Sequence, residues 1–402
     1  MESVESENTE YISSVYSRMI PIVSVGPSNG GPGELDKCEF LQRELERLQF
    51  EEIERVDSRD ERANGGVRPN LVARLRKRDT PTLWIVAHID TVPEGDISLW
   101  HHPPFAASFE DGKVYGRGTE DDGQGVVLGL LTAKKLIDQD RTNPKGYGFG
   151  LVFLSDEENG SVHGAEHVFR ARSFSKRDVF LVADAGSPDG SMIEVAEKTV
   201  LWLKLVVTGK QTHGSLPERG KNANRAGMKI ALAMDELLHR KYDATDPLFV
   251  PPTSTFEPTK REPNVPNINT VPGSDVCYFD CRILPKYDPA AILADLNELL
   301  RIQSKMLGVE ARIETVSSQR PAPITSPNSP VIRKLSSLLT VRRKIEPKPM
   351  GIGGGTDART LRAMGYESVV WMTCDETAHS PDEYARLSNI ISDSEVVMNL
   401  LE

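Results

Sequence analysis

The chain has 402 residues, which is long enough for two domains that each bury a core of their own. Hydrophobic residues make up 38% and charged residues 27%, and with 31 glycines and 27 prolines this is typical of a soluble, loop-rich α/β protein. The formal net charge of −11 argues against nucleic-acid binding, because phosphate groups are bound by clustered lysines and arginines. We interpret the acidity as ordinary surface charge that favours solubility.

The termini and the cysteines bear on the compartment. The first twenty residues lack a basic start followed by an apolar stretch, so we expect no signal peptide. No apolar run approaches the length of a membrane span, so we expect no membrane partner. Of the four cysteines, Cys277 and Cys281 share one face of a predicted strand and lack the CxxC spacing of metal-binding pairs. We therefore expect buried, reduced cysteines and a cytoplasmic protein.

The first part of the chain alternates helical and extended patterns. Ile12, Val15 and Met19 recur at helical spacing, and Pro21 is expected to end this first helix. A loop rich in glycine and proline leads into a second helix over residues 34–48. Short apolar runs then alternate with helical patterns, at residues 70–75, 83–87, 126–136, 150–154 and 179–183. This alternation predicts βαβ units and an α/β domain with a mostly parallel sheet.

From about residue 198 the pattern changes. Strands are predicted at 200–207, 276–284 and 311–316, and helices at 223–238 and from Asp288, where the following proline is typical of a helix start. These elements predict a compact α+β insertion. Residues 317–402 return to the α/β pattern, with a strand at 368–372. We therefore expect one domain from residues 1–197 and 317–402, interrupted by a second from residues 198–316.

Polar residues that suit metal binding follow the predicted strands of the first domain. They are His88 and Asp90 after residues 83–87, Glu157 and Glu158 after 150–154, Asp184 after 179–183, and His379 in the loop after 368–372. Ligands gather at the carboxyl ends of parallel strands, so these side chains are expected at one sheet edge. Each motif alone has a plainer interpretation, as a structural pair, a solvated loop or a turn. Together they have the composition of a two-metal hydrolytic centre.

In combination, the motifs at residues 85–91, 116–122, 155–160 and 378–384 resemble a known family. They look like those of the co-catalytic zinc amidohydrolases and peptidases that include acetylornithine deacetylase, succinyl-diaminopimelate desuccinylase, carnosinase, peptidase T and carboxypeptidase G. The resemblance covers nearly the whole chain, including the split-domain layout. It implies a catalytic domain interrupted by a smaller, ferredoxin-like α+β domain that acts as a lid and dimerisation domain, and hence a homodimer.

The resemblance also implies two divalent metal ions. The first would be held by His88, Asp121 and Asp184, and the second by Asp121, Glu158 and His379, with a hydroxide completing both coordination spheres. A carboxylate shared by both ions offsets their mutual repulsion, which is the role implied for Asp121. Mixed nitrogen and oxygen ligands suit Zn²⁺, with Co²⁺ or Mn²⁺ as alternatives. In this family the peptide bond after the bridging aspartate is cis, so we expect a cis bond between Asp121 and Asp122.

Three further residues have expected catalytic roles. Asp90 lies two residues from His88, where its carboxylate can accept the free imidazole N–H and fix the tautomer. Glu157 is the general base implied by the resemblance, which takes a proton from the attacking water and passes it to the leaving amine. His213, in the motif at residues 212–217, matches a histidine that reaches across the dimer interface and polarises the scissile carbonyl. A plain surface histidine is the alternative for His213.

Substrate-binding residues are implied at four positions. Asn269 and Arg282 match residues that bind a substrate carboxylate, for which a guanidinium offers two parallel hydrogen bonds. A surface ion pair with Asp280 is the alternative for Arg282. Gly354 and Gly355 belong to a segment that resembles the family's glycine loop, which brings backbone close to the substrate; a flexible turn is its alternative.

The expected function is therefore hydrolysis of the amide bond of a small peptide or an N-acyl amino acid. Aspartate at position 184 resembles the aminopeptidase and dipeptidase branch of the family and favours peptides. A biosynthetic deacylase, of the succinyl-diaminopimelate or acetylornithine type, is the alternative within the same chemistry. A catalytically silent binding protein on the same fold is the alternative from another class.

Overall fold

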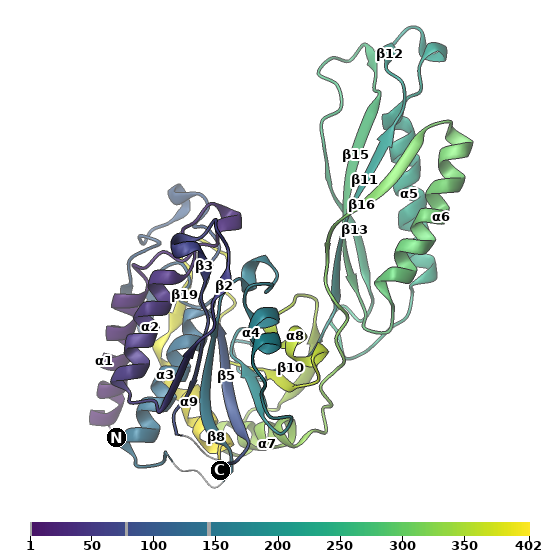
Figure 1. Cartoon of the computed structure of the whole chain (residues 1–402). Helices are drawn as coiled ribbons and strands as arrows, with labels where there is room; N and C mark the ends of the chain where they lie inside the picture. Colours follow the sequence, from purple (N-terminus) through teal and green to yellow (C-terminus); the bar gives the residue numbers. More distant parts are fainter. Residues whose placement is uncertain (1, 77–78, 143–145) are drawn as a thin grey trace. The chain divides into compact units, whose positions relative to one another are not determined.

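The computed structural model describes residues 2–76, 79–142 and 146–402, which form two compact units (Figure 1). The first unit comprises the chain up to Val195 together with Thr325–Met350 and Thr356–Glu402, and the second comprises Ala196–Ile324 and Gly351–Gly355. The sequence pattern assigned residues 317–324 and 351–355 to the first domain, and this differs from the structure. The glycine segment, residues 351–355, is held to the second unit by a hydrogen bond from the N–H of Gly351 to the carbonyl of Leu248 at 2.7 Å.

The first unit is built on a mixed eight-stranded sheet. In spatial order its strands are β1 (Glu52–Arg55), β4 (Leu71–Arg74), β8 (Gly148–Leu154), β5 (Thr82–His88), β9 (Val179–Val182), β18 (Glu367–Val370), β10 (Met192–Glu197) and β17 (Lys348–Ile352). The last two residues of β10 and of β17 are counted with the second unit. The central strands β8, β5, β9 and β18 run parallel. Strands β1 and β4 pair antiparallel with their neighbours, and β10 pairs antiparallel with β18. The α/β class predicted from the sequence is thus confirmed.

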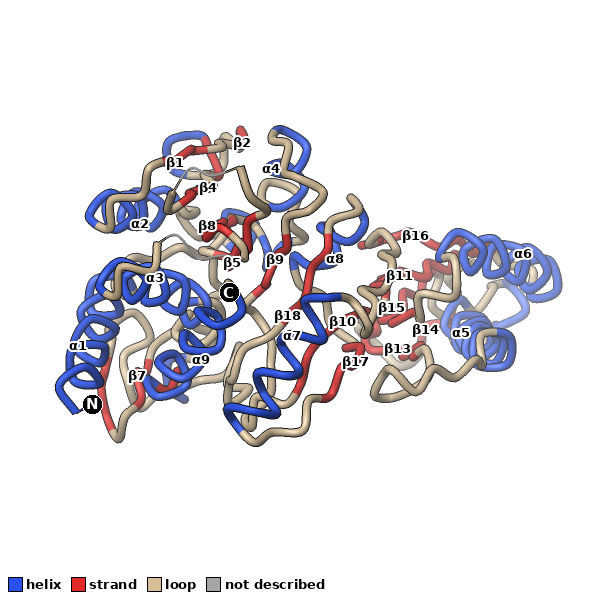
Figure 2. Tube along the Cα trace, turned by 90° about the horizontal axis from the view of Figure 1, so that it is seen from below, coloured by secondary structure: helices blue, strands red, loops and turns tan. Residues whose placement is uncertain are grey.

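Both faces of the central parallel strands are covered, as is usual where helices connect parallel strands. Every residue of β5 and β8 is buried, which matches their nearly continuous apolar sequences. Trp84 and Val86 of β5 pack with Val168 of α4 (Ala165–Ala171) and Leu361 of α8 (Asp357–Ala363) on one face. Helix α3 (Gly123–Asp138) packs against the other face of β5, and α9 (Leu387–Leu400) and α1 (Glu2–Met19) pack on α3 (Figure 2).

The helices of the first unit are α1 (Glu2–Met19), α2 (Leu35–Arg47), α3 (Gly123–Asp138), α4 (Ala165–Ala171), α7 (Pro330–Leu338), α8 (Asp357–Ala363) and α9 (Leu387–Leu400). Its short strands outside the large sheet are β2 (Ser58–Arg59), β3 (Val67–Arg68), β6 (Ser108–Glu110), β7 (Lys113–Tyr115) and β19 (Tyr384–Arg386). In the part of the chain that the structure describes, every helix is too short or too polar to cross a membrane.

The second unit is an antiparallel four-stranded sheet with two helices on one face. Its strands lie in the order β13 (Thr255–Arg261), β15 (Ser274–Ile283), β11 (Thr199–Thr208) and β16 (Glu310–Ser318). Helices α5 (Ala223–Lys241) and α6 (Pro289–Leu307) cover the sheet (Figure 1). Cys277, Phe279 and Cys281 alternate along β15 and are buried in this core, as the sequence predicted. A short ribbon of β12 (Thr212–His213) and β14 (Thr270–Val271) extends the unit.

Candidate metal centre

The predicted ligands of the first unit lie at the carboxyl edge of the parallel strands. His88 is the last residue of β5 and pairs with Leu154, the last residue of β8. Asp184 follows β9 by two residues, and His379 lies in the long loop between β18 and β19. Strand polarity therefore brings together residues that are far apart in the sequence.

These side chains form two groups that share one carboxylate. His88 Nε2 lies 2.7 Å from Asp121 Oδ1 and 3.7 Å from Asp184 Oδ1. His379 Nε2 lies 3.0 Å from Asp121 Oδ2 and 3.0 Å from Glu158 Oε1. Within each group the ligand atoms all lie within 4.8 Å of one another. Among the described residues, these are the two groups of histidine, cysteine and carboxylate side chains that suit a metal ion, and Asp121 belongs to both.

The peptide bond between Asp121 and Asp122 is cis, as predicted. The two neighbouring carboxylates serve different partners. Asp121 faces the two histidines, whereas Asp122 is buried and accepts the backbone N–H groups of His88 and Gly125, each at 3.0 Å. Because Gly125 lies in the first turn of α3, Asp122 caps this helix and ties its start to the end of β5.

Asp90 contacts the site through both its main chain and its side chain. His88 Nδ1 lies 3.1 Å from the backbone carbonyl oxygen of Asp90 and 3.5 Å from its Oδ1, so the shorter contact of the imidazole is with the backbone. The Asp90 carboxylate accepts the backbone N–H groups of Glu157 at 3.1 Å and Glu158 at 3.2 Å. Residue 90 thus contacts the His88 imidazole and binds the backbone of the Glu157–Glu158 turn through its side chain.

The Glu157 carboxyl group has an unusual electrostatic environment. Burial and the nearby charge of Asp184 raise the pKa of Glu157 well above its ordinary value. Asp357, which is buried and accepts the Ser161 hydroxyl at 2.6 Å, has a pKa raised to about 7, again mainly by burial. A raised pKa makes a carboxylate a stronger proton acceptor than an ordinary glutamate or aspartate, which suits proton transfer.

The acidic groups of the centre attract positive charge. Hydrogen bonds to Asp121 and Glu158 raise the pKa of His379 to about 10. Burial opposes protonation of His88, but its hydrogen bonds to Asp121 and Asp184 raise its pKa well above the ordinary value. The converging carboxylates therefore favour cationic partners at the two positions where metal ions are expected.

The remaining predicted residues belong to the second unit. His213 is exposed in β12, where its Nδ1 hydrogen-bonds with the Ser215 hydroxyl at 2.7 Å. Asn269 is adjacent, because its carbonyl accepts the N–H of Gly214 at 2.7 Å. Arg282 lies near the other end of β15, so the second unit does not bring Asn269 and Arg282 together. Arg282 forms the alternative ion pair with Asp280, at 2.6 and 2.9 Å.

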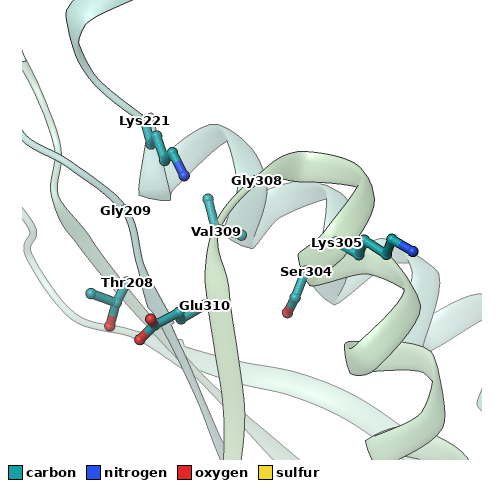
Figure 3. A pocket seen from close by; sticks show the side chains of 8 residues that line it. All are labelled: Thr208, Gly209, Lys221, Ser304, Lys305, Gly308, Val309 and Glu310. Carbon is teal, nitrogen blue, oxygen red and sulfur yellow. The ribbon is translucent and has the colours of Figure 1, made fainter.

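Arg282 also contacts the glycine segment, since its Nη1 donates to the carbonyl of Gly353 at 3.1 Å. The open space around Gly354 would admit a side chain without contact, so packing alone does not require glycine there. A separate pocket of about 320 Å³ in this unit is lined by Thr208, Gly209, Lys221, Ser304, Lys305, Gly308, Val309 and Glu310 (Figure 3). It contains none of the predicted site residues.

The sequence motifs indicate no role for Glu120 and Glu383, which are buried near the candidate metal ligands. Both lie inside the motifs at residues 116–122 and 378–384, so the available signal was an acidic residue in the same motif as a predicted ligand. Asp357 was also missed. It directly follows the glycine segment and Thr356, which offered no clue that it would lie near Glu157.

Comparison with known proteins places the chain in a family. Residues 84–402 match the model described as peptidase family M20/M25/M40. The chain is 38% identical over 427 residues to an uncharacterized metallohydrolase of Methanococcus maripaludis, covering 100% of both. It is 28% identical over 329 residues to a succinyl-diaminopimelate desuccinylase of Rickettsia canadensis, covering 80% of this chain and 82% of the relative.

The fold is also similar to a solved structure. Aminopeptidase PepT of Bacillus cereus superposes with a TM-score of 0.76 at 20% identity, covering 98% of both chains. At this identity the likeness concerns the fold. The family match extends over most of the chain and includes every residue of the two ligand groups. The chain therefore belongs to peptidase family M20/M25/M40 and is a metallohydrolase of that family.

Proposed function

We propose that the protein is a two-metal hydrolase that cleaves the amide bond of a small peptide or an N-acyl amino acid, with Glu157 as general base. The observation that carries this proposal is the pair of ligand groups that share Asp121. Each group offers one imidazole and two carboxylates, a donor set that suits Zn²⁺ and also Co²⁺ or Mn²⁺. When bound, two such ions would lower the pKa of water and polarise a carbonyl group.

Glu157 would handle the protons of the reaction. Water adds to the amide carbon, the carbon–nitrogen bond breaks, and the products are a carboxylate and an amine. Glu157 would accept a proton from the attacking water and deliver it to the leaving nitrogen, because an unprotonated amide nitrogen leaves poorly. The raised pKa of Glu157 and the Asp90 carboxylate that holds its backbone support this assignment.

Two substrate classes are supported by different observations. Aspartate at position 184 resembles the aminopeptidase and dipeptidase branch and supports a peptide substrate. Sequence similarity to the Rickettsia canadensis desuccinylase supports the alternative, a deacylase acting on an N-acyl amino acid. Both classes place a carboxylate near the scissile bond, for which the guanidinium of Arg282 is our proposed partner.

We further propose a homodimer in which His213 polarises the scissile carbonyl. Its ring is exposed on the β12–β14 ribbon, and His213 belongs to neither of the two ligand groups found among the described residues. Asn269 lies beside it, whereas Arg282 lies near the opposite end of β15. A dimer would allow the two chains to supply these residues to one substrate. The free, buried cysteines support our proposal of a reducing, cytoplasmic setting.

An activity screen tests the proposed function. The full-length protein, loaded in turn with Zn²⁺, Co²⁺ and Mn²⁺, is assayed with dipeptides and with N-acetyl and N-succinyl amino acids. Release of free amino acids from at least one panel is expected. Turnover of dipeptides alone selects the peptidase, and turnover of N-acyl substrates alone selects the deacylase. Full metal loading without hydrolysis in either panel would favour a binding protein on the same fold.

A further inference from the structure

Two buried carboxylates lie between the segments that carry Asp121 and His379. We define the Asp121 segment as residues 117–121 and the His379 segment as residues 375–383. Glu120 belongs to the first and Glu383 to the second, and their exposed fractions are 2% and 0%. Neither is a member of the two ligand groups. Burial of a carboxylate is costly unless hydrogen bonds compensate it, so the partners of both groups are informative.

Glu120 is bound entirely by the His379 segment in the contacts that the structure shows. Its carboxylate accepts the backbone N–H groups of Asp375 at 2.6 Å, of Thr377, and of Ala378 at 3.1 Å. It also accepts the Thr377 hydroxyl at 2.9 Å. Since Ala378 directly precedes His379, the Glu120 side chain fixes the position of the backbone just before this predicted ligand.

Glu383 makes the reverse connection. Its Oε1 accepts the backbone N–H groups of Glu120 at 2.9 Å and Asp121 at 3.0 Å. Its Oε2 accepts the N–H of Gly118 at 3.0 Å and the Arg117 guanidinium at 2.6 Å. All of these donors belong to the Asp121 segment, and one of them is the backbone of the shared ligand itself.

The two contacts are reciprocal, because each segment contributes one carboxylate and supplies the N–H donors that bind the carboxylate of the other segment. The backbone of His379 has a φ of 61°, in the left-handed region that non-glycine residues rarely adopt. Such a conformation persists only where the surroundings hold it, and the three N–H donors just before His379 are bound by Glu120.

We propose that Glu120 and Glu383 form a carboxylate cross-brace that sets the position of His379 relative to Asp121. They are positioning residues and not ligands. This inference rests on the proposed two-metal centre, because the cross-brace sets the distance between Asp121 and His379, which are both ligands of the second group. Glu120 acts on His379, which belongs to one group, whereas Glu383 acts on Asp121, which belongs to both.

This asymmetry makes the cross-brace testable by metal titration of the full-length protein. Glutamine in place of either residue keeps the shape but turns an NH₂ toward N–H donors. Glu120→Gln is expected to lower the affinity for one of the two zinc ions about tenfold and to leave the affinity for the other unchanged. Glu383→Gln is expected to lower both affinities about tenfold, because it disturbs the shared ligand. Affinities are measured by competition with a chromophoric chelator.

A matched control is available at the opposite edge of the same sheet. Asp178 is 2% exposed and accepts the N–H groups of Thr82 at 2.8 Å and Trp84 at 3.1 Å, so it is also a buried carboxylate among N–H donors. Asp178→Asn should lower the melting temperature and leave both zinc affinities unchanged. Thr377→Val removes the hydroxyl donor to Glu120 and also the hydrogen bonds of that hydroxyl with the main chain of Tyr384. It is a second variant that should weaken the binding of the zinc ion that His379 would hold.

Amide hydrogen exchange of the metal-free protein gives a second readout. Exchange should accelerate at residues 375–379 in Glu120→Gln and at residues 117–121 in Glu383→Gln, and at neither segment in Asp178→Asn. Wild-type zinc affinities in both glutamine variants, equal weakening of both zinc affinities in Glu120→Gln, or unchanged exchange would each overturn the cross-brace. If the wild type binds fewer than two zinc ions, the proposed function fails, and the exchange pattern still decides the cross-brace.

Discussion

The Asp90 carboxylate accepts the backbone N–H of Glu157 at 3.1 Å, so the residue expected to orient the histidine also holds the backbone of the proposed base. The imidazole of His88 has its shorter contact with the backbone carbonyl of Asp90. This division follows from geometry at the end of β5, where the chain turns and presents both its main chain and its side chain to the site. It changes what a substitution at position 90 should do.

Asp90→Asn should reduce turnover while keeping both metal ions. The asparagine retains the backbone carbonyl that faces His88 but offers one acceptor oxygen to two N–H groups, so the Glu157 turn loosens. A loss of about 10- to 100-fold in kcat is expected, by analogy with other residues that support a metal site. Metal content and kcat, measured on the same sample, check this. A fall in metal affinity with kcat retained would show that Asp90 acts through the imidazole.

Metal binding should release protons at neutral pH. In the metal-free protein the pKa of His379 is raised to about 10, so its imidazole is protonated at pH 7 and must lose that proton to bind a metal ion. Zinc affinity should therefore fall as the pH is lowered and rise as the pH approaches 10. Calorimetry in buffers of different ionisation enthalpy should detect at least one proton released per chain. Binding enthalpies that do not depend on the buffer would contradict this.

Arg282 should affect the binding of substrate more than the chemical step. Arg282→Ala removes a charged partner for a substrate carboxylate, and a rise in KM of roughly tenfold is expected from the loss of a charge-assisted hydrogen bond. Asp280→Asn is the control, since it breaks the ion pair and keeps the guanidinium. An unchanged KM in Arg282→Ala, with stability lowered equally in both variants, would reduce Arg282 to a structural ion pair.

His213 should act across the proposed dimer interface. His213→Ala is expected to lower turnover by about 10²- to 10³-fold, as for the loss of an oxyanion donor. Heterodimers of His213→Ala and Glu157→Gln chains should recover part of the activity, because one of the two sites then contains both native residues. Heterodimers that form and stay inactive would show that His213 serves its own chain.

The sequence predicted the parts of the structure that depend on local pattern. The continuous apolar runs of β5 and β8 identified buried parallel strands, and strand polarity then placed His88 and Asp184 at one edge. Strands β10 and β17 were missed because their short, mixed sequences lack a clear period. The contacts of Glu120 and Glu383 could not be predicted, since they depend on how two loops separated by more than 250 residues present their backbone N–H groups.

The kcat of metal-loaded Glu157→Gln tests the central claim most directly. Glutamine keeps the size of the side chain and removes its capacity to accept and deliver a proton, and Glu157 is not among the ligands of either group. We expect two metal ions per chain and a fall in kcat of at least about 10²-fold, the usual contribution of a general base. A kcat within a few-fold of the wild-type value at full metal loading would contradict it.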